Sequence, residues 1–398
     1  MKVLQIALKP PFPEVDGGCK AIHSITQGLL DHGVDVKLLT ICTEKHPFQS
    51  TKIPDSYLEK TQIEHVFVDT KVTPIGAFTN LFSQSSYNIE RFYSKQFEDL
   101  IVKTLQENSY SIVLLESVFL ANYIQAIRTN TRSKIVCRTH NVEHDIWFLN
   151  ASKEKGLKKR YLNYLAKKLK KAELKSLLSV DGIASITKKD ENRFKELGIN
   201  VPMQTIPYGI SSIEYKNNNT SVGKKVFHIG SMDWSPNLIG IKWLLDKVWL
   251  EVAKKHKDAE LNIAGRGMPS WLKDNKALNV NIVGEVESAI DFITSNHIMV
   301  VPLLTGSGMR IKIIEGMALG KLVITTAIGA SGINYSDKKN VVIANTPKEF
   351  SNAINYYLEH PEEQLKIGDA ATQLIKSEYD NNTIIRQLMA FCERLNNR

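Results

Sequence analysis

Short runs of aliphatic and β-branched residues alternate along the chain with longer stretches whose apolar residues recur every three or four positions. In the first half, strand-like runs occupy residues 2–8, 34–41, 111–117, 133–140 and 180–187, and a helical pattern covers Cys19 to His32. Such an alternation predicts βαβ units and a parallel sheet with helices on both faces. Residues 1–208 are therefore predicted to form a doubly wound, Rossmann-like α/β domain.

The pattern breaks near the middle of the chain and then starts again. Residues 211–225, SSIEYKNNNTSVGKK, are polar and without periodicity, as expected of a linker. Strand-like runs return at 225–232, 259–267, 280–286, 297–304 and 321–326. We predict a second Rossmann-like domain over 209–379 and a last helix, about 380–398, that can pack back on the first. Two such domains are expected to face each other across a cleft, because ligands of open α/β sheets bind at the strand C-termini.

Length and composition fit a soluble globular protein with more than one domain. The 398 residues are too many for one ordinary core, and 43% of them are apolar and 23% charged. Lys and Arg number 51 against 42 Asp and Glu, so the net charge is +9. That charge is compatible with an anionic ligand or an acidic surface and identifies neither.

Cysteine use and the first residues favour a cytoplasmic protein. The four cysteines are far apart and form no C-x-x-C pair, which argues against a zinc site and against a disulfide framework. The apolar run at 2–8 is too short for a signal-peptide core and is followed at once by prolines. No window approaches the ~18 apolar residues of a spanning helix. Any membrane role is therefore predicted to be peripheral, on the inner face of the cytoplasmic membrane.

The clearest candidate for chemistry is the stretch GSGMRIKIIEGMALG, which begins at Gly306. Gly306 and Gly308 allow the backbone to approach a ligand, and the helix predicted to begin nearby points free N–H groups and a partial positive charge at it. Arg310 and Lys312 add two cations that suit phosphate oxygens. Glu315 lies further along, where its oxygens can accept hydrogen bonds from sugar hydroxyls. The combination predicts a nucleoside diphosphate with its ribose.

The stretch does not match the sequence motifs of two other phosphate-binding loops. A Walker loop needs G-x-x-x-x-G-K-[ST], and a dinucleotide fingerprint needs a third glycine where Ile311 stands. A purely structural interpretation is also available, in which the glycines close a turn, Ile311, Ile314 and Ala318 face the core, and the charges are solvated. The residues of this stretch by themselves leave both interpretations open.

Four segments, taken in order along the chain, resemble one enzyme family. VPLLTGSGMRIKIIEGMALGKLVITTAIGASGI looks like the donor-binding segment of retaining glycosyltransferases of family 4, the group 1 enzymes with the two-domain GT-B fold. FHIGSMDWSPNLIGIKWLL resembles the start of the second domain in a bacterial sugar-transferase branch of that family. GGCKAIHSITQGLLDHGVDVKLLT resembles the glycine loop and helix of the first domain, and IPYGI the interdomain turn.

The resemblance implies roles for named residues of the second domain. Glu315 is expected to bind the ribose, and Arg310 and Lys312 to face the diphosphate and act in catalysis. Expected donor contacts also include Gly17, Gly18, Gly230, Arg266, Gly284, Gly306, Ser307, Gly308 and Met309. At Ser307 the family often has a glutamate that contacts the donor sugar, so the resemblance says less about which sugar is held.

In the first domain, the sequence CRTHNVEHDIW follows a predicted strand. By resemblance, His140 meets the donor sugar near its transferring carbon and is catalytic, while Glu143 or His144 orients the acceptor. The spacing of His140 and His144 could mimic a metal pair on a helix, but the spelling H-E-x-x-H is absent and no further ligand cluster is evident, so no metal is predicted. A structural histidine is the alternative.

The activity implied is transfer of a hexosyl-type sugar from a UDP- or GDP-sugar with retention of configuration. The acceptor implied is a glycan or a lipid-linked glycan in bacterial surface polysaccharide or glycoconjugate synthesis. Loss of the nucleoside diphosphate builds charge on its β-phosphate, which fixed cations and aligned amides stabilise. The chain contains no Asp-x-Asp pair, which agrees with a metal-independent site, and no cofactor is expected.

Residues 153–175 combine positive charge with helical periodicity. They hold ten Lys or Arg against two Glu, and Leu157, Tyr161, Tyr164, Leu165, Leu169 and Ala172 recur every three or four positions. Such a helix could lie on an anionic membrane, where a lipid-linked acceptor would be found. The alternative is a surface helix whose apolar face packs on the first domain while its lysines are solvated.

Three other classes of function compete with the transferase. A nucleic-acid-binding protein would also be basic, but no recognition module is spelled out and aromatics do not alternate with the cations, so no nucleic acid is expected. A nucleotide-sugar epimerase of the same fold would need acid and base carboxylates, of which no clear pair is evident. A non-catalytic sugar- or nucleotide-binding protein would share the fold without the chemistry.

Overall fold

The computed structural model describes residues 1–71, 73, 80, 85–211, 215, 222–306 and 308–397. It divides into two compact units, Met1–Gly209 with Asn382–Arg398 (unit 1) and Ile210–Asn381 (unit 2). Within the described ranges, no helix is long and apolar enough to cross a membrane.

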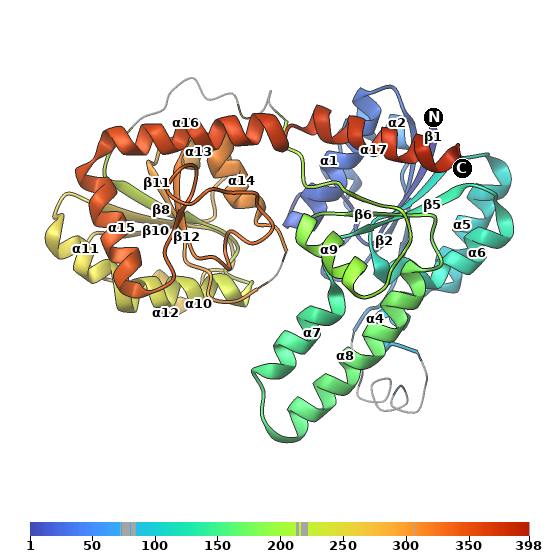
Figure 1. Cartoon of the computed structure of the whole chain (residues 1–398), viewed down its shortest axis with the longest axis horizontal. Helices are drawn as coiled ribbons and strands as arrows, with labels where there is room; N and C mark the ends of the chain where they lie inside the picture. The colour runs from blue at the N-terminus through green and yellow to red at the C-terminus, as the bar shows by residue number, and fades with distance from the viewer. Residues whose placement is uncertain are drawn as a thin grey trace. The chain divides into compact units, whose positions relative to one another are not determined.

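Unit 1 is built on one fully parallel sheet, whose order over the described residues is β3-β2-β1-β4-β5-β6-β7 (Figure 1). Its strands are β1 (Lys2–Ala7), β2 (Asp35–Cys42), β3 (Glu64–Phe67), β4 (Ile112–Leu115), β5 (Lys134–Thr139), β6 (Gly182–Ser185) and β7 (Met203–Thr205). Its helices are α1 (Gly17–Asp31), α2 (Asp55–Thr61), α4 (Tyr87–Glu90), α5 (Lys95–Glu107), α6 (Ile124–Asn130), α7 (Glu143–Ser152), α8 (Gly156–Leu177), α9 (Lys188–Glu196) and α17 (Asn381–Asn396), with short 3₁₀ turns η1 (Ser50–Lys52) and η2 (Val118–Tyr123).

Unit 2 repeats this architecture with a second fully parallel sheet, in the order β10-β9-β8-β11-β12-β13 over the described residues. The strands are β8 (Lys225–Ile229), β9 (Glu260–Ala264), β10 (Val280–Gly284), β11 (Ile298–Val301), β12 (Leu322–Thr325) and β13 (Val342–Ile343). The helices are α10 (Ser235–Leu244), η3 (Leu245–Trp249, a π turn), α11 (Leu250–Lys255), α12 (Ser270–Lys273), α13 (Ala289–Thr294), α14 (Ile311–Ala318), α15 (Pro347–Glu359) and α16 (Pro361–Glu378).

The strands predicted from the apolar runs are the central strands of these sheets and one edge strand, β10. Strands buried on both faces read as continuous aliphatic runs, which is why β4, β11 and β12 are wholly buried and easy to find. The edge strands β3, β7 and β13 carry partly exposed or very short segments and give no such run. The predicted linker at 211–225 lies mostly outside the described residues, and its last residue, Lys225, already begins β8.

The basic helix predicted at 153–175 is found as α8, but its apolar pattern is divided between two environments. Leu165 and Leu169 are buried, whereas Leu157 is 81% exposed and Tyr164 39%. The sequence pattern placed all four on one face. The second half of that face is covered within unit 1, so it is not available as one continuous surface.

The last helix, α17, packs on the sheet of unit 1. Ile384, Ile385, Leu388 and Phe391 belong to the same buried cluster as the β1, β4 and β5 residues Val3, Ile112 and Val136. The packing is close at β6, because a Cβ added to Gly182 would lie 2.5 Å from Leu395 Cδ1 and 2.9 Å from Phe391 Cζ. The chain therefore returns to its first unit after completing the second.

Removing the Phe391 ring is expected to destabilise unit 1. The side chain is 3% exposed, and truncating a buried Phe to Ala costs about 3–5 kcal/mol through lost burial and the cavity left behind. Hydrogen exchange of Phe391→Ala should show the loss in peptides of β5 and β6 and leave β8 and β9 unchanged. Gln387→Ala, an exposed position of the same helix, is the control. Equal loss in both units would contradict the assignment of α17 to unit 1.

Candidate functional site

The predicted donor residues of unit 2 gather at one edge of its sheet. Gly230 follows β8, Arg266 follows β9, and Gly284 ends β10. The loop after β11 leads to Arg310 and α14. Because the strands are parallel, their carboxyl ends meet at the same edge, on either side of the crossover between β8 and β11. Ser307 lies outside the described residues, and Met309 is a half-buried residue of the loop.

Arg310 is held at the N-cap of α14 by a ring and a carbonyl. Its guanidinium lies 5.1 Å from the centroid of Trp234, and its Nη1 donates to Gly308 O at 2.7 Å. Burial lowers the pKa of Arg310 to about 10, so the group stays charged at neutral pH. A Cβ on Gly306 would lie 2.8 Å from Arg310 Nη2 and 3.2 Å from the Trp234 ring, which explains the glycine there.

Lys312 is the second cation, and two neutral acceptors hold its ammonium group. Its Nζ donates to Asn237 Oδ1 at 2.9 Å and lies 3.3 Å from His228 Nε2. His228 is fully buried and its Nδ1 is 2.8 Å from Val300 O, so we assign Nδ1 as the protonated nitrogen and Nε2 as the acceptor. Burial and the Lys312 cation lower the pKa of His228 well below its usual value, which keeps the ring neutral.

Burial makes the charge on Lys312 easy to lose. Desolvation, with a smaller contribution from the positive charge of Arg310, lowers the pKa of Lys312 to about 7, while Glu315 opposes the shift. Two of the three ammonium N–H groups serve Asn237 and His228, which leaves one for a further acceptor. An anion bound here would restore the charge that burial disfavours.

Gly230 provides the space that the Lys312 ammonium occupies. A Cβ at this position would lie 2.3 Å from Lys312 Nζ and 2.8 Å from Asn237 Nδ2. Asn237 is itself fixed, since its Nδ2 donates to Ser231 O at 2.7 Å. Residue 230, after β8, is thus a glycine because a larger residue would collide with the Lys312 side chain from α14, on the other side of the crossover.

Glu315, the predicted ribose contact, is 4% exposed on α14. Its Oε1 accepts a hydrogen bond from the Tyr215 hydroxyl at 3.0 Å. A carboxylate buried to this extent needs donors, and a tyrosine from the predicted linker supplies one. Sugar hydroxyls would be donors of the same kind.

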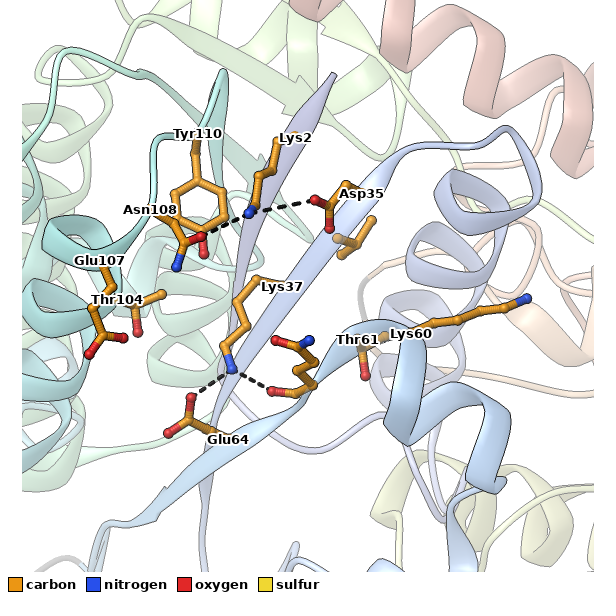
Figure 2. Close-up of a pocket in the computed structure, with 12 residues that line it drawn as sticks. Lys2, Asp35, Lys37, Lys60, Thr61, Glu64, Thr104, Glu107, Asn108 and Tyr110 are labelled. Carbon is orange, nitrogen blue, oxygen red and sulfur yellow. Dashed lines mark hydrogen bonds and ion pairs between the residues drawn. The ribbon is translucent and has the colours of Figure 1, made fainter.

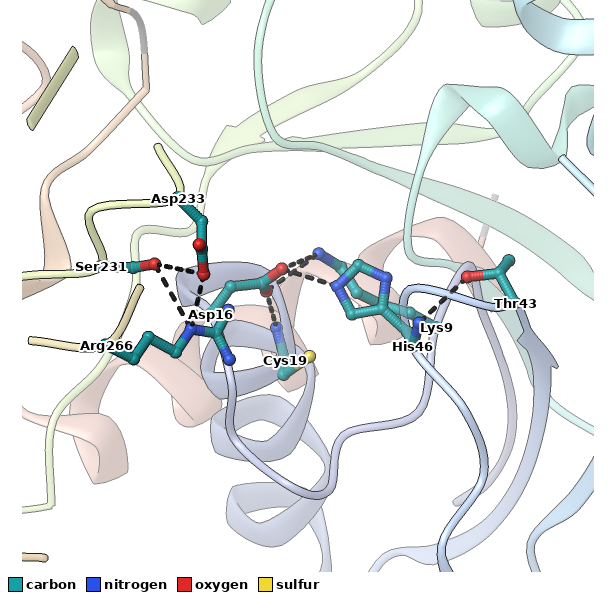
Figure 3. Close-up of polar contacts among 8 residues, drawn as sticks. All are labelled: Lys9, Asp16, Cys19, Thr43, His46, Ser231, Asp233 and Arg266. Atoms are coloured by element: carbon teal, nitrogen blue, oxygen red, sulfur yellow. Dashed lines mark hydrogen bonds and ion pairs between the residues drawn. The ribbon is translucent and has the colours of Figure 1, made fainter. Parts of the chain in front are cut away.

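Arg266 lies at the end of β9 with part of its charge already compensated. Its Nε is 3.3 Å from Ser231 Oγ and 3.5 Å from Asp233 Oδ2 (Figure 3). Gly284 has a left-handed backbone (φ +81°) with open space around its α-carbon, so its glycine serves the turn after β10. These two residues share the edge with Arg310 and Lys312.

In unit 1, Gly17 and Gly18 begin α1, and the residue before them organises the turn. Asp16 caps α1 by accepting from Cys19 N at 3.0 Å, and it also accepts from Lys9 Nζ at 2.9 Å and lies 2.8 Å from His46 Nε2 (Figure 3). Although burial works in the opposite direction, these bonds hold the pKa of Asp16 well below its usual range. A Cβ on Gly18 would lie 2.6 Å from Lys9 Nζ, so the glycine admits a cation to the helix N-terminus.

Among the described residues, one group has metal-ligand spacing. Asp16, Cys19 and His46 each offer a ligand atom within 4.8 Å of the others. The Asp16 carboxylate is already paired with Lys9, and burial raises the pKa of the Cys19 thiol to about 12, far from the thiolate that a metal prefers. The group is accounted for by the capping of α1.

His140 follows β5 and lies above a buried charge network. Its Nε2 is 3.6 Å from Glu116 Oε2, and Glu116 also accepts from Arg138 Nη1 at 3.0 Å and from Gln5 Nε2 at 2.7 Å. Burial lowers the pKa of His140 and outweighs the opposite effect of Glu116, so the imidazole is neutral at pH 7. Arg138 and Glu116 are both fully buried, which fixes the strand end that carries His140.

Glu143 and His144 begin α7, and both backbone amides donate to one carboxylate. Glu173 of α8 accepts from Glu143 N and His144 N, each at 3.0 Å, and lies 2.6 Å from His144 Nδ1. His144 is fully buried, so the structure gives it a role in fixing α7, and its contact with an acceptor stays a prediction. Burial and the nearby Glu173 charge raise the pKa of Glu143 to about 7.

A separate cavity of about 330 Å³ lies at the other end of the unit 1 sheet (Figure 2). Four of its charged side chains form two pairs: Lys37 Nζ is 2.6 Å from Glu64 Oε1, and Lys2 Nζ is 3.6 Å from Asp35 Oδ2. It faces the amino ends of β1 and β2, away from the glycine turn after β1. These residues brace the strand starts and offer no excess charge to a ligand.

Known proteins share a sequence segment and the fold of this chain. Residues 223–360 match the family model described as "Glycosyl transferases group 1". The solved structures similar to this chain include sucrose-phosphate synthase from Thermosynechococcus elongatus (TM-score 0.69, 13% identity, covering 99% of each chain). They also include Anabaena HepE in complex with UDP and glucose (TM-score 0.67, 13% identity, covering 98% of this chain and 99% of that one). The chain is a glycosyltransferase of the GT-B fold.

A curated relative from Klebsiella pneumoniae matches nearly the whole chain. It is described as an uncharacterized 44.6 kDa protein in the cps region, and it is 25% identical over 403 residues, covering 97% of this chain and 98% of its own. Beside the predicted residues, the structure places others that sequence reasoning missed: Lys9 and Asp16 in unit 1, and Tyr215, His228, Trp234 and Asn237 in unit 2. Of these, Asp16 could have been found, because an Asp directly before a glycine pair and a helical pattern is a typical N-cap.

The raised pKa of Glu143 gives a test of the α7–α8 contact. Glu173→Gln removes the second cause of the shift and leaves burial, so the pKa of Glu143 is expected to fall below 7 while staying above its usual value near 4.5. Carboxyl ¹³C shifts of Glu-labelled protein, assigned with Glu143→Gln, measure the titration. Glu191→Gln, a carboxylate on α9, is the control and should leave it unchanged. A Glu143 pKa that does not respond to Glu173→Gln would contradict the electrostatic origin.

Proposed function

We propose that the chain is a retaining, metal-independent glycosyltransferase that moves a hexosyl-type sugar from a UDP- or GDP-sugar to a glycan or lipid-linked acceptor. The observation that carries the proposal is the pair of buried cations, Arg310 and Lys312, set beside the buried carboxylate Glu315. All three lie at the carboxyl edge of the unit 2 sheet, inside the segment that matches the glycosyltransferase family model. A sugar-binding protein would have no use for the two cations.

The chemistry follows from where the charges lie. When the bond from the anomeric carbon to the β-phosphate oxygen breaks, negative charge grows on that oxygen. Arg310 can bind phosphate oxygens through two N–H groups, and Lys312 contributes one N–H and a full charge. Both are held in place before the reaction, so they favour the transition state without reorganising. The protein's own cations thus supply the stabilisation for which other transferases use a metal ion.

Glu315 is proposed to bind the ribose, with the hydroxyls replacing or adding to the Tyr215 donor. On the unit 1 side, neutral His140 is suited to a hydrogen bond with the donor sugar and carries no charge that would repel a developing cationic carbon. Glu143, with a pKa near 7, is able to accept a hydrogen bond from an acceptor hydroxyl. Gly17, Gly18 and Lys9 present a helix N-terminus and a cation to the diphosphate.

The setting proposed is bacterial surface polysaccharide or glycoconjugate synthesis in the cytoplasm, with no cofactor. The relative from Klebsiella pneumoniae is described by its place in a cps region, and HepE is described in complex with UDP and glucose. Neither description fixes the sugar or the linkage for this chain. They support a nucleotide sugar as donor and a glycan as product.

The first test is a thermal-shift panel of UDP, GDP, ADP and their sugars, without divalent metal and with EDTA. One nucleotide should raise Tm, because binding at a hundred times its Kd adds about 2.7 kcal/mol to the free energy of unfolding. Arg310→Ala and Glu315→Ala are expected to remove the shift and to abolish transfer or hydrolysis of the donor. Arg386→Ala, an exposed position on α17, is the control.

Three outcomes would count against the proposal. Activity that is lost in EDTA and restored by Mg²⁺ would contradict metal independence. Conversion of the donor's sugar into its epimer, with the same nucleotide, would indicate an epimerase. Binding of the donor without turnover would indicate a sugar-binding protein. Full activity in both variants would contradict the site.

The second test uses the pKa of Lys312. Because that pKa is about 7 in the empty site, raising the pH from 7 to 9 removes the proton from the free protein, whereas a bound diphosphate favours the ammonium form. Binding therefore takes up a proton, and the affinity for the nucleotide selected by the panel should fall by up to about tenfold per pH unit. Isothermal titration in two buffers of different ionisation enthalpy measures both quantities.

Lys312→Met should bind more weakly and lose this pH dependence, since the phosphate pKa of about 6 lies below the range tested. Lys321 is the matched control, because burial lowers its pKa to about 8 but it precedes β12 at the other edge of the sheet, where its Nζ donates to Thr294 O. Lys321→Met should keep the slope. If nucleotide affinity falls equally with pH in the wild type and in Lys312→Met, then Lys312 is not the group that takes up the proton on binding.

A further inference from the structure

The end at which α7 and α8 meet brings exposed charge and exposed apolar side chains together. We call residues 149–160 the hairpin tip, all of which the structure describes. Its cations are Lys153, Lys155, Lys158, Lys159 and Arg160, against a single acidic residue, Glu154, so its net charge is 5 − 1 = +4. All five cations are exposed, and so are Leu149 (45%) and Leu157 (81%).

The rest of the hairpin is a packed structure that holds the tip outward. The two helices lie side by side and project from the sheet of unit 1 (Figure 1). Ala151, Leu165, Ala166 and Leu169 are buried, and the Glu173 bonds fix the first turn of α7. The tip is therefore presented at the end of a packed pair of helices. Because the middle of the apolar stripe of α8 is buried within unit 1, the stripe as a whole cannot lie along a membrane surface.

The charges of the tip repel one another in the protein alone. Glu154 pairs with Lys158 at 2.8 Å, and within the tip no ion pair is recorded for the other four cations. Lys155 is the N-cap of α8 without a side-chain bond, and the first turn holds no acidic residue. Cations at this end of a helix meet the positive end of its dipole, so the arrangement is unfavourable until an anionic partner approaches.

We propose that the hairpin tip docks end-on on an anionic lipid bilayer, with Leu157 entering the hydrocarbon boundary and the surrounding lysines among the headgroups. The positive charge favours an anionic partner, and exposed Leu157 favours an anionic partner that also has an apolar interior, as a lipid bilayer does. A nucleic-acid backbone would satisfy the lysines, but it would leave Leu149 and Leu157 in water. The contact would hold unit 1 at the surface on which a lipid-linked acceptor lies, yet it depends on neither donor nor acceptor.

The experiment is vesicle co-sedimentation of the full chain without nucleotide. Binding is expected to phosphatidylglycerol–phosphatidylcholine vesicles, to weaken as salt is raised, and to be absent from pure phosphatidylcholine. Leu157→Ser should weaken binding by about tenfold, and Lys158→Glu with Lys159→Glu by about tenfold or more. These side chains are exposed, so the melting temperature should not fall.

Matched controls come from an exposed patch of unit 2. Leu278 is 50% exposed near the exposed Lys273 and Lys276, so Leu278→Ser and the pair Lys273→Glu with Lys276→Glu make the same chemical changes away from the tip and should bind vesicles as wild type does.

Three results would overturn the proposal. The first is equal binding to neutral vesicles. The second is full vesicle binding by Leu157→Ser together with displacement of the protein by inorganic pyrophosphate, which would show a phosphate contact only. The third is displacement from vesicles by a DNA oligonucleotide that Leu157→Ser also binds. Failure of donor binding in the nucleotide panel would leave the result of this assay unaffected.

Discussion

The proposed donor site depends on keeping two cations, Arg310 and Lys312, buried in one place. Glu315, the nearby carboxylate, favours the charged form of Lys312 and accepts a hydrogen bond from Tyr215. The π face of Trp234 lies beside Arg310, and the imidazole of His228 and the amide of Asn237 hold the Lys312 ammonium. These three partners are neutral, so they fix the cations without adding a negative charge. The glycines Gly230 and Gly306 follow from this arrangement, because a Cβ at either would collide with the cation it admits.

Unit 1 treats its buried charges in the opposite way. The buried pair Glu116 and Arg138 and the half-buried pair Asp16 and Lys9 have opposite signs and short contacts, so they stabilise a strand end and a helix start without a net charge. Breaking such a pair leaves an unpaired buried charge, which is costly, and this makes the pairs effective for fixing geometry. His140 and the glycine pair that begins α1 therefore lie next to paired charges, whereas the buried cations Arg310 and Lys312 of unit 2 are held by neutral groups. That division agrees with one unit positioning groups and the other binding an anion.

The sequence predicted the α/β architecture because buried parallel strands have a strong signature, as β4, β11 and β12 illustrate. It did not predict the edge strands β3, β7 and β13, which are short and partly exposed, although it did predict the edge strand β10. For the site, local spelling located Arg310, Lys312 and Glu315 on or next to one helix. Their partners could not be found, because His228 and Asn237 are 84 and 75 positions from Lys312 and meet it only when β8 and β11 pair. The periodicity of 153–175 was similarly ambiguous, since a helical period cannot tell which half of an apolar stripe a neighbouring helix will cover.

The two basic regions of the chain also differ in how firmly they are held, and this separates what each can recognise. Arg310 and Lys312 are buried and pinned, so they fit an anion of defined shape at a defined distance, such as a diphosphate. The lysines of the hairpin tip are exposed on long side chains with few partners, so they can follow a surface of anions whose positions are not fixed. Net charge alone could not distinguish these cases, because both regions add to the same +9. Burial does distinguish them: a desolvated cation selects one ligand at a cost in stability, and a solvated cluster gives a weaker, salt-sensitive attraction that needs an apolar group such as Leu157 to become specific for lipid.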